Sequence, residues 1–165
     1  MNWGKFIGNI YQERRRSPGV RARPAFYDAA TDSVINTAEL RLNVRLPDSL
    51  RSLLSETDGV MDMMSIDGGE WFENMWLLWT VEELIERNEF YRDEMKQGVY
   101  KCDFMNLLVF ADAGTDGNLF GFSLEKDRNC KPRVVCWDSI TNEINVLASS
   151  LEEFLRGWLT GTISV

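Results

Sequence analysis

The residues of this chain with the most obvious chemical potential are carboxylates, and one stretch concentrates them. Between Arg51 and Arg87 there is no lysine or arginine, but there are nine acidic residues. Methionines and tryptophans stand among them: Met61, Met63, Met64, Trp71, Met75 and Trp76. Acid mixed with large apolar side chains suits the binding of a basic protein through charge complementarity. The alternative is a solvated acidic face whose aromatic residues lie in the core.

Catalysis by these residues is a weaker interpretation. Two carboxylates would suffice for glycoside hydrolysis, but acids are so abundant that no pair stands out. The chain has no histidine, which excludes Ser-His-Asp and Cys-His catalysis and histidine zinc sites. These grounds leave carboxylate, lysine and tyrosine chemistry open, and they single out no catalytic residue.

The cysteines and glycines give no sign of a cofactor. Three cysteines without a C-x-x-C pattern predict reduced thiols and no structural zinc, with Cys136 in the core. Gly114, Gly117 and Gly121 match neither a dinucleotide-binding fingerprint nor a P-loop, and are better explained by a turn and close strand approach. Asp112 and Asp116 lack the EF-hand pattern, so we expect them to cap that turn and expect no metal.

The charge is unevenly spread along the 165 residues. The net charge is −8. Residues 1–51 have nine basic and five acidic residues, whereas residues 52–165 have nine and twenty-one. An acidic region of this size lacks the cations that phosphate binding requires, so we expect no nucleic-acid partner. No apolar run is long enough to cross a membrane and no standard secretory signal is present, which predicts a cytoplasmic protein.

Periodicity predicts one α+β domain over residues 1–165, with an N-terminal helix and loop in 1–31 and a core in 32–165. Trp3, Phe6, Ile7, Ile10 and Tyr11 share one helix face, which either packs on the domain or docks elsewhere, for example on a membrane surface. Residues 17–31 are expected to be a loop.

Further helices are predicted over about 32–42, from Leu46-Pro47-Asp48 to Asp58-Gly59, over 80–95 and from Ser150 onward. Thr80 with Glu83, and Ser150 with Glu153, form capping boxes. Residues 60–79 are expected to hold short strands. The apolar runs at 107–111, 119–124, 133–138 and 144–147 predict an antiparallel meander, a central sheet with helices from both ends of the chain packed on it.

Several segments, taken in order, resemble one family. They are Ile35-x-x-Ala38-Glu39-Leu40, Leu46-Pro47-x-x-Leu50-x-x-Leu53-Leu54-x-x-x-Asp58-Gly59-Val60, Leu78-Trp79-x-x-x-Glu83-x-Ile85, Leu107-Leu108-Val109-Phe110-Ala111-Asp112-x-Gly114 and Val134-Val135-x-Trp137-Asp138. The chain resembles the SUKH superfamily, which includes bacterial immunity proteins and fungal Smi/Knr cell-wall regulators. It departs from the family pattern at Asp58, usually asparagine, and at Ser139-Ile140, usually His-Glu.

The resemblance implies a non-enzymatic domain that binds another protein. Bacterial members commonly bind and block a secreted toxin, often a nuclease, and the acidic stretch would suit a basic toxin domain. The partner-binding residues predicted on this basis are Asp58, Asp62, Asp67, Glu70, Trp71, Asp112 and Asp116. The alternative function is an intracellular regulator or scaffold with a housekeeping partner.

Overall fold

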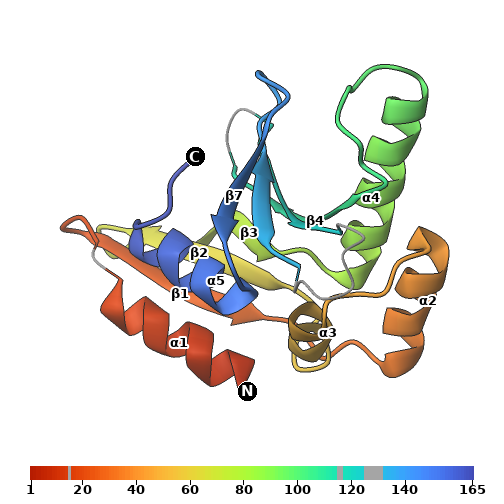
Figure 1. Cartoon of the computed structure of the whole chain (residues 1–165). Helices are drawn as coiled ribbons and strands as arrows, with labels where there is room; N and C mark the ends of the chain where they lie inside the picture. Colours follow the sequence, from red (N-terminus) through yellow and green to blue (C-terminus); the bar gives the residue numbers. More distant parts are fainter. Residues whose placement is uncertain (15, 115–116, 125–131) are drawn as a thin grey trace.

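The α+β class predicted from the sequence is confirmed. The computed structural model describes residues 1–14, 16–114, 117–124 and 132–165, and these form two antiparallel sheets and five helices (Figure 1). The helices are α1 (Trp3–Glu13), α2 (Asp32–Leu42), α3 (Asp48–Leu54), α4 (Val81–Lys96) and α5 (Leu151–Thr160). The strands are β1 (Val20–Phe26), β2 (Val60–Ile66), β3 (Phe72–Leu78), β4 (Leu107–Asp112), β5 (Leu119–Ser123), β6 (Val134–Trp137) and β7 (Ile144–Ala148). Among these described parts no helix has the length and apolar composition to cross a bilayer.

The predicted helix starts are confirmed by side-chain caps. The Thr80 hydroxyl accepts the N–H of Glu83 at 3.2 Å, and the Ser150 hydroxyl accepts that of Glu153 at 3.1 Å. Each cap satisfies a backbone donor that the helix itself leaves unpaired. The expected C-terminus of α3 is wrong, because the helix ends at Leu54, before Asp58-Gly59. Gly59 does have a positive φ of 102°, but it lies directly before β2 and not at the end of a helix.

The N-terminal helix packs on its own domain. Trp3, Ile7, Ile10 and Tyr11 are buried, and α1 lies against β1 and α5 (Figure 1). Trp3 is further fixed by its backbone N–H, which donates to Glu56 at 2.7 Å. The apolar face of α1 is therefore occupied within the domain and is not free to dock on a membrane.

The first sheet contains a strand that the sequence did not predict. Residues 17–31 were expected to be a loop, but β1 pairs with β2 from Val20–Ile66 to Phe26–Val60, and β3 pairs with the other side of β2. Pro24 argued against a strand in the sequence, since proline has no backbone N–H to donate to a neighbouring strand. It is tolerated here because β1 is an edge strand.

The second sheet is the predicted meander in the order β4-β5-β6-β7. A Cβ on Gly121 would lie 2.8 Å from the Leu108 carbonyl oxygen, so the close strand approach expected there is confirmed. Strands β4, β5 and β6 are buried on both faces, whereas β7 is largely exposed. Phe110, Phe120 and Cys136 belong to the main core, whereas Val109, Trp137 and the loop residue Phe104 form a second cluster.

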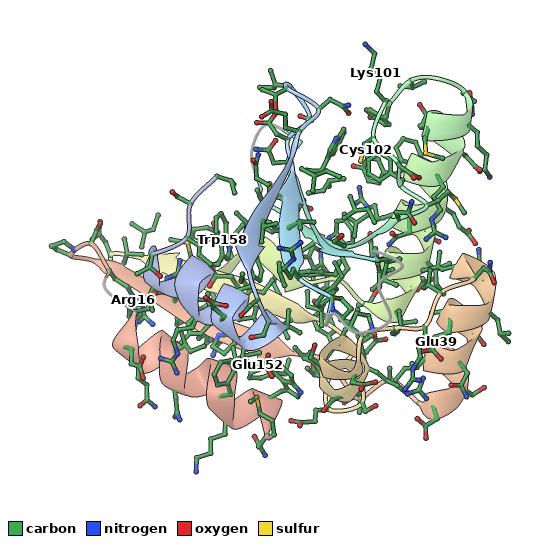
Figure 2. All side chains as sticks on the ribbon, in the orientation of Figure 1. Arg16, Glu39, Lys101, Cys102, Glu152 and Trp158 are labelled. Carbon is green, nitrogen blue, oxygen red and sulfur yellow. The ribbon has the colours of Figure 1, made fainter. Side chains whose placement is uncertain are left out.

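Side chains fill the space between the helices and the sheets (Figure 2). Two buried polar residues, Asn88 and Arg92, hold α4 in place. Asn88 exchanges two hydrogen bonds with the backbone of Val109 at 2.7 and 3.0 Å. Arg92 donates to the carbonyl oxygens of Leu42, at the end of α2, and of Phe104. Sequence periodicity identified neither residue, because both are polar types on a buried helix face.

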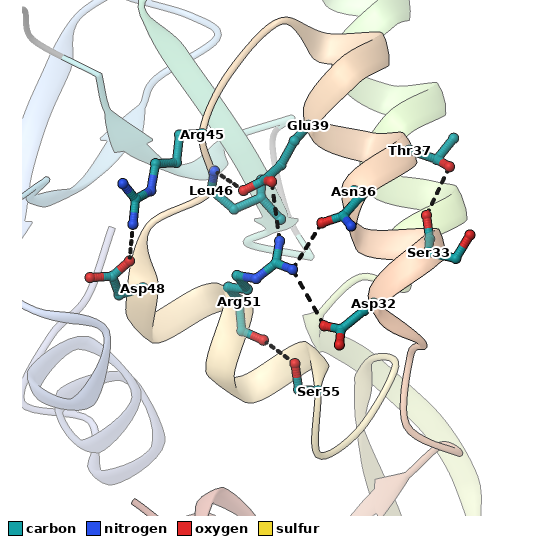
Figure 3. A network of polar contacts seen from close by, with 10 residues as sticks. All are labelled: Asp32, Ser33, Asn36, Thr37, Glu39, Arg45, Leu46, Asp48, Arg51 and Ser55. Atoms are coloured by element: carbon teal, nitrogen blue, oxygen red, sulfur yellow. Dashed lines mark hydrogen bonds and ion pairs between the residues drawn. The ribbon is translucent and has the colours of Figure 1, made fainter.

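A polar network attaches α3 to α2. The Arg51 guanidinium donates to Glu39 at 3.1 Å, to Asn36 at 2.9 Å and to Asp32 at 3.3 Å (Figure 3). The other Glu39 oxygen accepts the N–H of Leu46, where the chain turns into α3. Glu39 and Leu46 both belong to the motif that carries the family resemblance, and the structure gives that motif a structural role.

Candidate protein-binding surface

The two faces of the β1–β3 sheet are built differently. In an antiparallel sheet, directly opposed residues share a face. Arg23, Met63 and Glu73 are in register across the three strands, as are Met61 and Trp76 on β2 and β3. We call this side the outer face, defined by Arg21, Arg23, Met63, Trp71, Glu73 and Trp76. None of the six is buried, whereas the opposite, inner face lies against α1.

Aromatic side chains on the outer face are held in place by their neighbours. The Arg23 guanidinium lies 4.4 Å from the ring centroid of Trp71, and that of Arg21 lies 5.6 Å away. Trp76 packs on Tyr27 with ring centroids 5.4 Å apart. A large ring already fixed in one orientation loses less entropy when a partner covers it. Trp71 therefore has the properties of a preorganised interface anchor.

The turn that joins β2 to β3 places carboxylates beside this anchor. Asp67 and Glu70 are exposed, and Glu73 follows on β3. Asp67 adopts a φ of 48° and donates its backbone N–H to the Gly19 carbonyl, which fixes the turn against the start of β1. Within the described residues, none of these three carboxylates forms an ion pair. Glu73 was absent from the predicted site, and only the strand register brings it there.

Asp62 does not lie on this surface. Its side chain is 0% exposed on the inner face, where it accepts hydrogen bonds from Tyr11 Oη at 2.7 Å and Asn74 Nδ2 at 2.9 Å. Arg14 approaches both of its oxygens at 3.1 and 3.2 Å. Alternation along β2 was the available signal, because Asp62 is in phase with the buried Val60. Asp62 thus joins α1 to the sheet and offers no exposed atom to a partner.

Asp58 lies apart from the β2–β3 turn, just before the opposite end of β2. It is half-buried and accepts the N–H of Val81 at 2.6 Å, at the start of α4. Burial raises the pKa of its carboxyl. It lines a shallow groove between α2 and α4 together with Val34, Glu82, Ile85 and Glu86.

Asp112 caps its turn, as the sequence predicted. A side-chain oxygen accepts the N–H of Gly114 at 2.9 Å, and a Cβ on Gly114 would touch Met75 of β3. Asp116 lies outside the described residues. Within the described part of the chain no group of three or more Cys, Asp or Glu side chains could hold a metal ion.

The two described cysteines are buried core residues, which confirms the prediction for Cys136. Burial raises the pKa of each thiol to about 11. Thiols in this state are protonated at neutral pH and are poor nucleophiles. Neither cysteine therefore indicates a reactive site.

Comparison with protein families agrees with this structure. The family model described as SMI1 / KNR4 family (SUKH-1) matches residues 29–157, more than half of the chain. The chain belongs to the SMI1/KNR4 (SUKH-1) family. The SUKH resemblance seen in the motifs is thereby confirmed. No curated protein matches the chain.

The extent of the SUKH-1 match divides the surface into two parts. The match begins after β1, so α1 and β1 lie outside it, whereas β2, β3 and the turn with Asp67, Glu70 and Trp71 lie inside. Arg21 and Arg23, which orient Trp71, therefore come from a strand beyond the family match.

Proposed function

We propose that this SUKH-1 chain is a non-enzymatic, immunity-type protein that binds and neutralises a basic protein toxin through the outer face. The observation that carries the proposal is Trp71, packed against Arg23 and bordered by the carboxylates of Asp67, Glu70 and Glu73, which form no ion pair with any described residue. An oriented aromatic ring beside exposed carboxylates suits the binding of an oppositely charged protein, and the three carboxylates outnumber the two arginines of this face.

The two kinds of residue would contribute differently. Trp71 would be covered on binding and would supply most of the affinity, because large aromatic residues dominate interface energetics. The carboxylates would raise the association rate by attracting a basic surface. A nuclease toxin fits this role because it must attract phosphate and so tends to be basic. Such a toxin would be met in the cytoplasm, where it would otherwise act.

The other predicted residues take secondary places in this proposal. Asp112 is partly exposed at the β4–β5 turn, and Asp58 lies in the α2–α4 groove, so both would widen the attractive field from its edges. Asp62 would support the site from the inner face without touching the partner.

The test is recovery of the partner with a matched pair of variants. The tagged chain is purified from its native cell and bound proteins are identified by mass spectrometry. The site variant carries Asp67→Asn, Glu70→Gln and Glu73→Gln. The control carries Glu89→Gln, Glu94→Gln and Glu152→Gln, which removes the same charge from α4 and α5, outside the α2–α4 groove that holds Asp58. We expect a basic toxin domain with the wild type and the control, and its loss with the site variant.

Other outcomes would change the conclusion. Equal loss in both triple variants would indicate that net charge alone attracts the partner, and would contradict the assignment to the outer face. Recovery of a housekeeping assembly, with no toxin domain, would support the regulator or scaffold role instead.

A further inference from the structure

The two sheets have four edge strands, but β3 and β4 lie against each other, so β1 and β7 are the outermost strands of the described structure. Of these two, β1 alone has residues that protect it against pairing with another chain. β1 ends the first sheet and β7 ends the second. β1 carries Arg21, Arg23 and Pro24, and charged residues and proline are the usual means of blocking an edge strand. β7 reads Ile144-Asn145-Val146-Leu147-Ala148, with no charge and no proline.

The side chains of β7 are unusually apolar for a free edge. Ile144 is 48% exposed and Val146 is 54% exposed. Each is in register with a buried residue of β6, Trp137 and Val135, so they extend the second hydrophobic cluster beyond its last covered strand. β7 rises from α5 toward a hairpin tip that projects from the domain (Figure 1). The exposed row is therefore continuous with a core and open on one side.

The backbone of β7 also has hydrogen-bonding groups at these residues that no described residue pairs. Asp138 donates its N–H to the Glu143 carbonyl at 2.9 Å, so this is a hydrogen-bonded pair. Hydrogen-bonded and non-bonded pairs alternate along an antiparallel ladder. The next pair along the ladder, Trp137–Ile144, is therefore non-bonded. Val135–Val146 lies two positions further along β7 and is non-bonded as well. Ile144 and Val146 therefore direct their N–H and C=O groups away from β6.

We propose that a second copy of this chain covers β7, through antiparallel pairing of two β7 strands about a twofold axis at Asn145. In this register Ile144 of each copy opposes Val146 of the other, and the outward backbone groups of both residues are paired. The exposed apolar side chains then form one row across the two copies. A symmetric contact of this type closes after two subunits and does not continue into a fibre.

The neutrality of β7 argues against the basic partner proposed above and is compatible with a second copy. The chain has a net charge of −8, so two copies repel each other over most of their surface. β7 is a neutral segment where they can approach. The twofold register also places Glu143 opposite Leu147 of the other copy, and so keeps the two Glu143 carboxylates apart. A basic toxin gains no electrostatic attraction from a neutral strand. This inference does not rest on the proposed function.

The first test is the oligomeric state of the full chain by sedimentation velocity over a range of concentrations. We expect a concentration-dependent dimer that is stabilised by salt, because salt screens the repulsion between two acidic copies. Binding of a basic partner would show the opposite salt dependence. Val146→Lys should raise the dimer dissociation constant by roughly tenfold or more, because it places a lysine from each copy within the symmetric contact. Ile140→Lys, outside the strand, is the control and should leave it unchanged.

A crosslink tests the register itself. In the proposed pairing the two Asn145 residues form the closer, non-bonded type of pair, so the Asn145→Cys variant should form a disulfide-linked dimer on mild oxidation. Thr141→Cys should not. Both variants carry Cys130→Ser, because Cys130 is the third cysteine of the chain and lies outside the described residues, whereas Cys102 and Cys136 are buried. Circular dichroism checks that each variant remains folded. A monomer at every concentration and salt, or a Val146→Lys dimer as tight as the wild type, or equal crosslinking at both positions, would overturn the proposal.

Discussion

The inner and outer faces of the β1–β3 sheet use the same residue types for different purposes. On the inner face, Tyr11, Arg14 and Asp62 form a buried cluster that attaches α1 to β2. On the outer face, Trp71 stacks with Arg23 while Glu73 remains exposed. Both faces combine an aromatic ring, an arginine and a carboxylate. They differ in whether the carboxylate is already satisfied.

This difference separates a structural role from a binding role. The Asp62 carboxylate accepts bonds from three side chains, so a partner could form new contacts with it only by breaking existing ones. The outer-face carboxylates have no ion-pair partner among the described residues, so they lose only bound water on contact with a cation. Changes on the inner face should therefore alter stability, and changes on the outer face should alter binding.

The largest expected effect is on the inner face. Asp62→Ala leaves the Tyr11 hydroxyl and the Arg14 guanidinium without their acceptor. Breaking a buried ion pair by removing one member costs about 3–5 kcal/mol, and Arg14, which is partly exposed, favours the lower end. We expect the free energy of unfolding in urea to fall by this amount. Glu70→Ala on the outer turn should change it by less than about 0.5 kcal/mol, and equal losses in the two variants would contradict the comparison.

How far the sequence predicted these faces depends on how local the signal is. The starts of α4 and α5 follow from a Thr or Ser cap and the residues next to it, and the meander follows from contiguous apolar runs. The strand β1 was not predicted because its pairing partner, β2, lies about 40 residues further along the sequence and because Pro24 obscures its pattern. No window of the sequence around β1 contains the β2 strand that makes an edge proline acceptable.

The candidate site was predictable in composition but not in arrangement. Trp71, Asp67 and Glu70 were identified from the mixture of acid and aromatic residues, and they lie together on one turn. Asp62 was grouped with them although its phase along β2 places it on the buried face. Glu73 and Arg23 joined the site only through register, because they flank Met63 from strands on either side. Pairing between distant strands is the information that a single sequence lacks.

The second prediction concerns the outer-face anchor. Trp71→Ala should weaken binding of the captured basic partner by about 30-fold, which corresponds to the roughly 2 kcal/mol typical of an aromatic hot spot. Stability should change little, because Trp71 is only partly covered. Titration calorimetry and thermal unfolding measure the two effects separately. A variant that unfolds at much lower temperature yet binds normally would contradict the comparison, because it would give the outer face a structural role and no binding role.

The third prediction uses pH to isolate the inner face. Burial, followed by the charge of Asp62, raises the pKa of Tyr11 above its ordinary value. Stabilisation from the protonated phenol is complete below the unfolded-state pKa of about 10 and is lost as pH rises above it. Tyr11→Phe should cost about 1.5 kcal/mol at neutral pH, because it removes a hydrogen bond to a charged group.

The pH dependence of that difference is the decisive measurement. Wild type and Tyr11→Phe are unfolded in urea at several pH values from neutral to above 10. The stability gap should be constant up to about pH 10 and should then close, since the wild type alone must keep this phenol protonated. Tyr91, whose pKa burial also raises, is present in both proteins and cancels. A gap that widens at high pH would mean that Tyr11 is not held as a donor to Asp62.

The smallest effect is expected from the arginine that orients the anchor, and its sign tests the mechanism. Arg23→Ala removes a positive charge from the binding face, so electrostatics alone predicts faster association with a basic partner and tighter binding. Loss of the stacked guanidinium frees the Trp71 ring, and a contact of this kind is worth about 0.5–1 kcal/mol at an exposed site. We expect the dissociation rate to rise about threefold while the association rate does not fall, as surface plasmon resonance can resolve.

Arg23→Lys keeps the charge but loses the planar stack, and should share the faster dissociation. If Arg23→Ala only accelerates association, then Trp71 needs no orientation by β1, and the binding surface would be confined to the turn and strands within the family match.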